Sequence, residues 1–289
     1  MAGQLAPTIE SVEIELASHT HTALACGPPD GELVLLLHGF PQTADAWRSL
    51  LSALGAAGYR ALAPNQRGYC AGARPSDRRA YATGELVKDA LDFANFQMAE
   101  RFHVVGHDWG GAIAWHVAAL EPDRVITLTS VATPHPKAFA ESLPRSTQLL
   151  RSSYMGLFRT PWVAEQVLSA GNFIALRVML ERSGLRPEFA RRYVDVLREP
   201  GALTAALNWY RAAGLGTSKV GEIEVPTLYV WGAKDTALGP EAARRTEKYV
   251  SGVYRFEALE DAPHWIPEEC PDQLRDLLLG FLERHGARV

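Results

Sequence analysis

Residues 102–111 read FHVVGHDWGG, and the apolar, strand-like start of this segment leads almost at once into a helix-like run, 110–120. Gly106 and Gly110 stand two residues before and two residues after Asp108. This is the Gly-x-nucleophile-x-Gly form of a sharp strand-to-helix turn, in which larger flanking side chains would collide. The start of the helix would direct free N–H groups toward Asp108 and favour negative charge there. We therefore expect Asp108 to be a nucleophile; the alternative is a tight connection in which Asp108 only caps the helix.

Strand-like and helix-like runs alternate on both sides of this turn. The runs that predict strands are 12–16, 33–37, 59–63, 102–105, 125–131, 227–231 and 253–258. The runs that predict helices are 45–57, 83–98, 110–120 and 272–284. Such alternation is typical of an α/β protein with a mostly parallel central sheet flanked by helices. His19 and His21 are expected in an exposed early segment, with no role in a site.

The pattern becomes mostly helical between about Pro136 and Val220. The breaks in this block fall at Pro144, Pro161, Gly171, Pro187 and Pro200-Gly201. Because parallel sheets bind ligands beyond the carboxyl ends of their strands, we expect the block to form a lid, or cap, over that edge. The predicted division is a first part of the core at 1–136, a helical cap at 137–221 and a second part of the core at 222–289.

A second motif, His38-Gly39-Phe40-Pro41, follows the first long apolar run. A loop at this point could turn the backbone N–H of Phe40 toward Asp108. Together with the N–H of Trp109, it would form a pocket of two donors, an oxyanion hole. The alternative is that His38-Gly39 only ends a strand.

A candidate base and its orienting acid lie near the end of the chain. His264 stands in Asp261-Ala262-Pro263-His264-Trp265, after the last predicted strand, where a loop would reach the active edge of the sheet as a general base. Asp235 follows the preceding strand, whereas the other possible location reads Ala132-Thr133-Pro134 and offers no carboxylate. Asp235 is therefore the candidate that orients His264; its alternative role is that of a turn residue near Gly239-Pro240.

These motifs, in this order over nearly the whole chain, resemble the epoxide hydrolase and haloalkane dehalogenase branch of the α/β-hydrolases. Esterases and lipases of that superfamily carry serine at the turn, where this chain has Asp108. The resemblance implies an α/β-hydrolase fold with an inserted helical cap. It also implies a catalytic triad of Asp108, Asp235 and His264.

Two segments of the cap resemble those that carry ring-opening tyrosines in epoxide hydrolases. They are Asn208-Trp209-Tyr210-Arg211 and residues 153–161, SYMGLFRTP. By this resemblance, Tyr154 and Tyr210 would donate hydrogen bonds to the epoxide oxygen, although helical aromatic residues are more often packing residues. The residues expected to contact substrate beside them are His38, Pro41 and Trp265.

The resemblance implies an epoxide hydrolase in which Asp108 forms an ester that is cleaved by water activated by His264. A haloalkane dehalogenase with the same nucleophile is the first alternative, and a catalytically silent binding module of this fold is the second. Phe40 replaces the asparagine that dehalogenases commonly use for halide, and Trp109 replaces the arginine that follows the nucleophile in fluoroacetate dehalogenases. Residues 65–69, NQRGY, also depart slightly from the family's usual Asp-x-Arg-Gly.

Composition bounds the partners. The formal net charge of −4 gives no electrostatic reason to expect nucleic acid or an anionic membrane as partner. The three cysteines are far apart in sequence and the early residues lack a secretion signal, so a cytoplasmic location is expected. No apolar run is long enough to predict a membrane span. We expect a small apolar epoxide and water as ligands, with no metal or organic cofactor. A homodimer is left open, as is the choice between detoxification and secondary metabolism.

Overall fold

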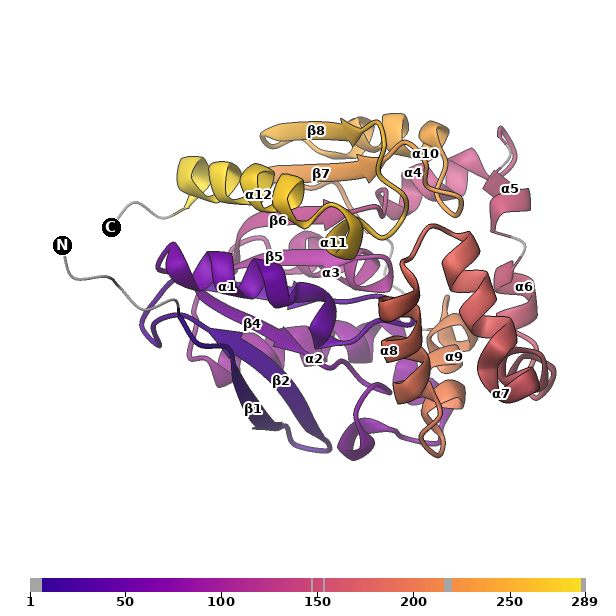
Figure 1. Ribbon diagram of the computed structural model, residues 1–289. Coiled ribbons are helices and arrows are strands. Elements are labelled where there is room, and N and C mark those ends of the chain that lie inside the picture. Colours follow the sequence, from indigo (N-terminus) through magenta and orange to yellow (C-terminus); the bar gives the residue numbers. More distant parts are fainter. Residues whose placement is uncertain (1–6, 147, 153, 216–219, 287–289) are drawn as a thin grey trace.

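The computed structural model describes residues 7–146, 148–152, 154–215 and 220–286. Its centre is an eight-stranded sheet in the order β1-β2-β4-β3-β5-β6-β7-β8 (Figure 1). The strands are β1 (Glu10–Glu15), β2 (Thr20–Cys26), β3 (Leu33–Leu37), β4 (Arg60–Pro64), β5 (Phe102–His107), β6 (Val125–Val131), β7 (Thr227–Gly232) and β8 (Tyr254–Leu259). β2 pairs antiparallel with β1 and with β4, and all other neighbours are parallel. The predicted mostly parallel α/β sheet is confirmed.

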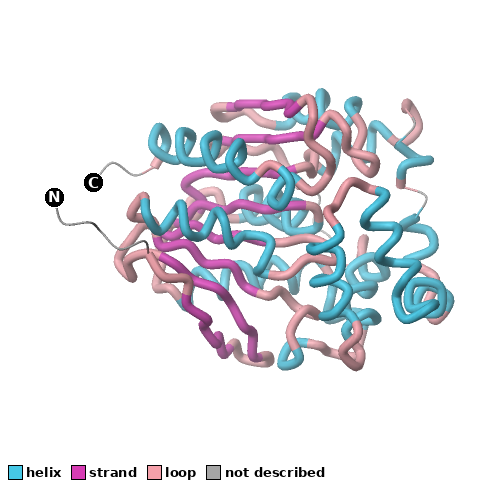
Figure 2. The backbone as a smooth tube through the Cα atoms, in the orientation of Figure 1, coloured by secondary structure: helices cyan, strands magenta, loops and turns pink. Residues whose placement is uncertain are grey.

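Helices cover both faces of this sheet. α1 (Arg48–Ala56) and α12 (Pro271–His285) lie together on one face, and α2 (Thr83–Phe96) and α3 (Trp109–Leu120) lie on the other (Figures 1 and 2). Every residue of β3, β5, β6 and β7 is buried, as expected for parallel strands that are covered on both sides. The shorter elements are η1 (Ala44–Trp47), η2 (Ala71–Ala73), η3 (Arg78–Tyr81), α10 (Pro240–Arg245), η4 (Thr246–Tyr249) and α11 (Ile266–Glu269).

A block of helices separates β6 from β7 in the sequence. These helices are α4 (Pro136–Ser142), α5 (Gln148–Arg151), α6 (Tyr154–Phe158), α7 (Val163–Arg182), α8 (Pro187–Leu197) and α9 (Ala202–Ala212). Figure 1 shows α6 to α9 gathered beyond the carboxyl ends of the central strands. The predicted Pro and Gly breaks fall between these helices, at the first residue of α8, or at a kink in α7. The cap boundaries at 137–221 stay a prediction.

The kink interrupts the longest helix of this block. Residues 170–173 leave the helical conformation, and Gly171, Asn172 and Phe173 have positive φ. Among the helices that the structure describes, α7 alone has the length and apolar composition to cross a membrane. A membrane-spanning helix satisfies its backbone groups by continuous hydrogen bonding, which the kink interrupts. The absence of a membrane span stays a prediction.

One strand was not predicted. The early segment expected to be exposed contains β2, and within it the side chain of His21 is fully buried. The ring of His21 packs edge-on against Phe93, with centroids 5.0 Å apart, and its Nδ1 lies 3.0 Å from the carbonyl oxygen of Asn65. The expectation of exposure is therefore wrong for His21, because antiparallel pairing of β2 with β1 and β4 carries this polar segment into the sheet.

Candidate active site

Asp108 occupies the sharp turn between β5 and α3. Its backbone has φ 51° and ψ −119°, a conformation that L-residues rarely adopt and that marks a strained position. A Cβ atom on Gly106 would lie 2.2 Å from the carbonyl oxygen of Gly110. A Cβ atom on Gly110 would lie 2.1 Å from the carbonyl oxygen of Leu37. The turn can therefore form only with glycine at both flanking positions. The side chain of Asp108 makes no capping hydrogen bond with α3, which argues against the helix-cap interpretation.

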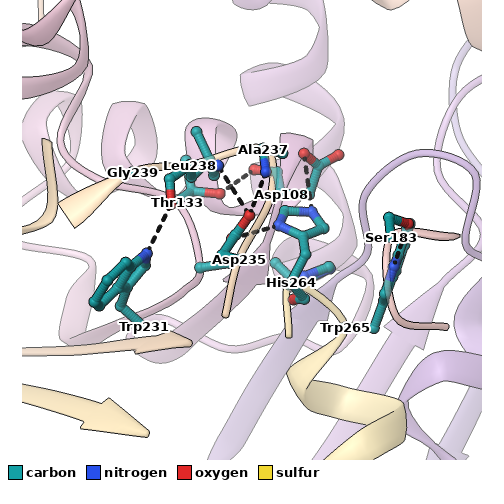
Figure 3. Close-up of polar contacts among 12 residues, drawn as sticks. Asp108, Thr133, Ser183, Trp231, Asp235, Ala237, Leu238, Gly239, His264 and Trp265 are labelled. Carbon is teal, nitrogen blue, oxygen red and sulfur yellow. Dashed lines mark hydrogen bonds and ion pairs between the residues drawn. The ribbon is translucent and has the colours of Figure 1, made fainter. Parts of the chain in front are cut away.

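The carboxylate of Asp108 lies between a backbone donor and a histidine. The N–H of Phe40 donates to Oδ1 at 2.9 Å, and Nε2 of His264 is 3.6 Å from Oδ2 (Figure 3). Burial alone would raise the pKa of Asp108, but the hydrogen bond and charge of His264 outweigh burial and hold this pKa below its ordinary value. The carboxylate is therefore ionised and aimed at the cavity described below.

His264 is oriented by Asp235. Nδ1 of His264 lies 2.8 Å from Oδ2 of Asp235, whose side chain is fully buried. The other oxygen, Oδ1, accepts hydrogen bonds from the backbone N–H groups of Ala237 (2.7 Å) and Leu238 (2.9 Å) (Figure 3). Burial would lower the pKa of His264, but the charges of Asp235 and Asp108 outweigh it and raise this pKa to about 10. The structure thus brings the three predicted triad residues together from the turns after β5, β7 and β8.

One of the two predicted oxyanion donors contacts the carboxylate. Phe40 lies in the loop after β3, and its N–H already holds Oδ1 of Asp108. Trp109 is the first residue of α3, directly after Asp108. Within the described part of the chain no hydrogen bond from the Trp109 N–H to Asp108 is formed, so its role as second donor stays a prediction.

Tyr154 at the start of α6 and Tyr210 in α9 lie close to each other in the helical block. Their ring centroids are 6.4 Å apart, and the ring of Tyr210 stands edge-on to that of Trp109 at 5.0 Å. Burial raises the pKa of both phenols well above the ordinary value, and the charge of Asp108 adds to this shift. Both side chains therefore keep their protons at neutral pH and can donate hydrogen bonds.

Two cavities meet at these residues. The first, of about 270 Å³, and the second, of about 250 Å³, are both lined by Asp108, Tyr154 and Tyr210. The first cavity continues along side chains of the core loops and of α6 and α7, namely Phe40, Phe158, Met179, Leu180, His264 and Trp265. The second cavity continues along α3, α4, α6 and the end of α9, with Ala112, Phe139, Met155 and Ala213 in its wall. The carboxylate of Asp108 and the phenols of Tyr154 and Tyr210 thus line two adjoining cavities that are largely apolar.

The three predicted substrate-contact residues have different positions. Trp265 lines the first cavity, and its indole N–H donates to Oγ of Ser183 at 2.9 Å (Figure 3). His38 and Pro41 are buried and line neither cavity. Nδ1 of His38 lies 3.0 Å from the Gly39 carbonyl oxygen, and its Nε2 accepts from the N–H of Gln66, so both ring nitrogens are occupied. The prediction that His38 and Pro41 contact substrate is corrected, because both lie outside the linings of these two cavities; the hydrogen bonds of His38 instead hold the loop that carries Phe40.

Sequence reasoning missed a group of buried polar side chains beneath this loop, made up of Gln42, His107 and Glu268. Gln42 Nε2 donates to Glu268 Oε1 at 2.7 Å, and Nδ1 of His107 lies 2.7 Å from Gln42 Oε1. Glu268 lies four residues after His264, but no motif marks it, and 226 residues separate it from Gln42. Among the described residues, no group of three or more His, Cys, Asp or Glu side chains is placed to hold a metal ion.

Comparisons with known proteins agree with this geometry. Residues 32–271 match the family model described as alpha/beta hydrolase fold. The AB hydrolase superfamily protein YfhM of Bacillus subtilis is 35% identical over 267 residues, which cover 90% of this chain and 93% of that protein. Epoxide hydrolase 4 of Homo sapiens is 34% identical over 271 residues, covering 90% of this chain and 75% of that protein. A crystal structure of Bacillus megaterium epoxide hydrolase in complex with an inhibitor has a TM-score of 0.84 at 25% identity, with 94% of this chain and 100% of that chain covered.

The fold and the carboxylate turn thus define a member of the α/β-hydrolase fold family, to which this chain belongs. Within that family, its relatives place it in the epoxide hydrolase branch.

Proposed function

We propose that this chain hydrolyses small apolar epoxides to vicinal diols through a covalent ester on Asp108. The observation that carries the proposal is the shared cavity: an ionised carboxylate and two protonated phenols, Tyr154 and Tyr210, line the same apolar space. A strained three-membered ring needs attack at carbon and stabilisation of the leaving oxygen on the opposite side. The site supplies both within one space.

In the first step, a carboxylate oxygen of Asp108 attacks an epoxide carbon, and the bond from that carbon to the ring oxygen breaks. Tyr154 or Tyr210 donates its proton to the developing alkoxide, and the second phenol donates a hydrogen bond. The products are a hydroxyalkyl ester on Asp108 and a phenolate. The apolar lining keeps water from competing for these hydrogen bonds.

The second step follows from the charge balance of the site. In the free enzyme, Asp235 and Asp108 hold a proton on His264. The ester on Asp108 is neutral, so one of these two charges disappears and the pKa of His264 falls. His264 then gives its proton back to the phenolate and becomes a base.

A water molecule loses a proton to His264 and attacks the carboxyl carbon of the ester. The Phe40 N–H, already on Oδ1, stabilises the oxyanion. Collapse of this intermediate breaks the bond to the diol oxygen, which takes the remaining proton of the attacking water. The diol leaves, Asp108 is a carboxylate again and His264 is protonated again. Protons therefore balance over the cycle.

Two observations favour this proposal over the alternatives. Two phenols line the cavity of the carboxylate, with Phe40 where haloalkane dehalogenases commonly carry an asparagine, and the similar proteins include several named epoxide hydrolases. A silent binding module would need no aligned triad, yet His264 lies 2.8 Å from Asp235 and 3.6 Å from Asp108.

The proposal is tested with a panel of aryl, alkyl and fatty epoxides, assayed for diol beside haloalkanes assayed for halide. We expect diol from at least one epoxide, with turnover abolished in Asp108→Ala. Asp261→Ala is the matched control, because Asp261 is an exposed carboxylate three residues before His264 that pairs with exposed Lys234. Halide release without diol formation, or an active Asp108→Ala variant, would contradict the proposal.

A further inference from the structure

A buried chain of hydrogen bonds runs from α8 to the loop that carries the oxyanion donor. It begins at Tyr193 in α8, whose hydroxyl group donates to Glu268 Oε1 at 2.5 Å. The same oxygen accepts from Gln42 Nε2 at 2.7 Å. All three side chains are buried: Tyr193 and Gln42 are 0% exposed and Glu268 is 3% exposed.

The far end of Gln42 holds the turn next to the nucleophile. Its Oε1 accepts from the N–H of Gly39 at 2.9 Å. A Cβ atom on Gly39 would lie 2.3 Å from Cβ of Asp108, so the loop backbone at this glycine lies directly against the nucleophile. The next residue, Phe40, donates its N–H to Asp108. A small shift of Gly39 would therefore move the oxyanion donor.

Gln42 also reaches the residue before the nucleophile. Because Gln42 Oε1 is an acceptor, the proton of its contact with His107 lies on Nδ1 of His107. Burial lowers the pKa of His107 to about 3, so its ring is neutral and Nε2 then carries no proton; the 2.9 Å approach of Nε2 to the backbone oxygen of His264 is a contact and not a hydrogen bond. One amide group thus binds both the oxyanion loop and the residue before Asp108.

Glu268 determines which way this amide faces. A Gln side chain can turn over and exchange its oxygen and nitrogen at nearly no steric cost. Glu268 Oε1 accepts from the NH₂ group, so the oxygen must face Gly39 and His107. Without that acceptor, the turned amide would set its NH₂ group against the N–H of Gly39, whereas neutral His107 could accept from the turned amide by carrying its proton on Nε2 instead.

Burial of the Glu268 carboxyl group costs free energy. Its second oxygen, Oε2, is buried and has no hydrogen-bond partner within the described residues. Burial raises the pKa of Glu268 to about 7, against the opposing hydrogen bonds from Tyr193 and Gln42. An apolar side chain of similar size would fill this place without an unsatisfied oxygen. The presence of a glutamate at position 268 is therefore explained better by the hydrogen bonds that Oε1 accepts than by packing.

We propose that Glu268 is a positioning residue for ester hydrolysis, acting through Gln42 on the Phe40 N–H. The proposal rests on the ester mechanism proposed above. Ester formation needs an ionised Asp108 and the phenols, none of which contacts Glu268. Ester hydrolysis needs the oxyanion donor at Oδ1, which depends on Gly39 and Phe40. Loss of Glu268 should therefore slow the second step selectively.

Single-turnover kinetics with intact-protein mass spectrometry separate the two steps. In Glu268→Leu, we expect hydrolysis of the ester to slow about tenfold or more, as for loss of an oxyanion contact. We expect ester formation to change less than about threefold. The ester then accumulates, and kcat and KM fall together. Glu268→Gln keeps an acceptor oxygen at Oε1 and should hydrolyse the ester within about threefold of the wild-type rate.

Glu269→Leu is the matched control, because Glu269 is a partly exposed neighbour that pairs with Arg186 on the surface; its two rates should be unchanged. If Glu268→Leu does not fold, Gln42→Leu removes the same amide and should show the same selective loss. A wild-type rate of ester hydrolysis in the folded Leu variant, or equal losses in both steps, would overturn this role for Glu268. Accumulation of ester in His264→Gln shows separately whether the ester mechanism holds, so the two failures are distinguishable.

Discussion

At the residue scale, the site is a set of charges that stabilise one another, and the proposed ester would remove one of them. Asp108 and His264 face each other at 3.6 Å, and each holds the other in its charged form. Asp235 holds His264 from the other side. Alkylation of Asp108 would neutralise one of the two carboxylates and leave His264 with a lower pKa. The residue that bonds to substrate would thus also prepare the base for the next step.

The charge pair predicts a pH-dependent stability. The folded pKa of His264, about 10, exceeds its ordinary value of 6.5, so protonated His264 stabilises the fold. This stabilisation is complete below pH 6.5 and is lost as pH rises through about 10. Asp108 has a lowered pKa, so its contribution is present above its ordinary pKa of 3.8 and is lost as pH falls.

The free energy of unfolding, measured in urea for wild type and His264→Gln, should therefore differ most near pH 6. The difference should shrink toward pH 10.5. A difference between wild type and His264→Gln that is constant from pH 6 to 10.5 would show that His264 is not held protonated in the fold.

The two phenols predict a graded loss of ring opening. Tyr154→Phe or Tyr210→Phe should each slow ester formation about tenfold or more, because one phenol remains to protonate the alkoxide. The double variant should lose about 10³-fold, in the range of general-acid catalysis. Stopped-flow measurement of single turnovers gives these rates. Tyr249→Phe, which loses only a surface hydrogen bond to Glu141, should leave them unchanged. An active double variant would exclude the phenols as acids.

At the scale of elements, the strand-to-helix turn determines where the nucleophile stands. β5 ends at His107 and α3 begins at Trp109, so the strained Asp108 is the only residue between them. Gly110 fits because its hydrogen atom faces the backbone of Leu37, which belongs to the central strand β3 and cannot move aside. The strain at Asp108 is therefore sustained by the packing of neighbouring strands.

Gly110→Ala should lower the free energy of unfolding by about 3 kcal/mol, because the added carbon meets backbone rather than a flexible side chain. Gly84→Ala in α2 is the matched control, since a Cβ atom there meets nothing within 4 Å. That variant should be more stable by about 0.5–1 kcal/mol. Urea unfolding measures both changes. Equal stabilities of the two variants would contradict the close approach at the turn.

The features that could be predicted from the sequence have a local pattern, whereas those that were missed depend on contacts between distant parts of the chain. β3 was predicted at its observed bounds, 33–37, because this strand, buried on both faces, is apolar throughout. β2 was missed because threonine and histidine interrupt the apolar pattern of Thr20–Cys26. Its pairing with β4, which lies far away in the sequence, leaves no local signal. Asp108 was found because its turn imposes glycines locally. Glu268 was not found, since its significance arises only from contact with Gln42, far away in sequence.

At the scale of the whole molecule, the site joins two sources of side chains. The sheet and its loops contribute the carboxylate, the histidine and the backbone donor. The helices between β6 and β7, of which α6 to α9 lie beyond the strand ends (Figure 1), contribute Tyr154 and Tyr210. Both tyrosines line both cavities. Trp209 Nε1 donates to the backbone oxygen of Arg67 at 2.8 Å, so α9 is bonded to the core one residue before Tyr210. Under the proposed mechanism, the sheet would fix the nucleophile and the helices would shape the substrate space.

The covalent ester on Asp108 is tested most directly by isotope transfer in a single turnover. Enzyme in excess over epoxide is allowed to react in water enriched in ¹⁸O. The diol and the peptide that contains Asp108 are then weighed by mass spectrometry. The mechanism predicts a diol without ¹⁸O, because its new oxygen comes from the Asp108 carboxylate, and one ¹⁸O atom in the Asp108 side chain. A first-turnover diol that carries ¹⁸O, with Asp108 unlabelled, would show that water attacks the epoxide directly and would contradict the mechanism.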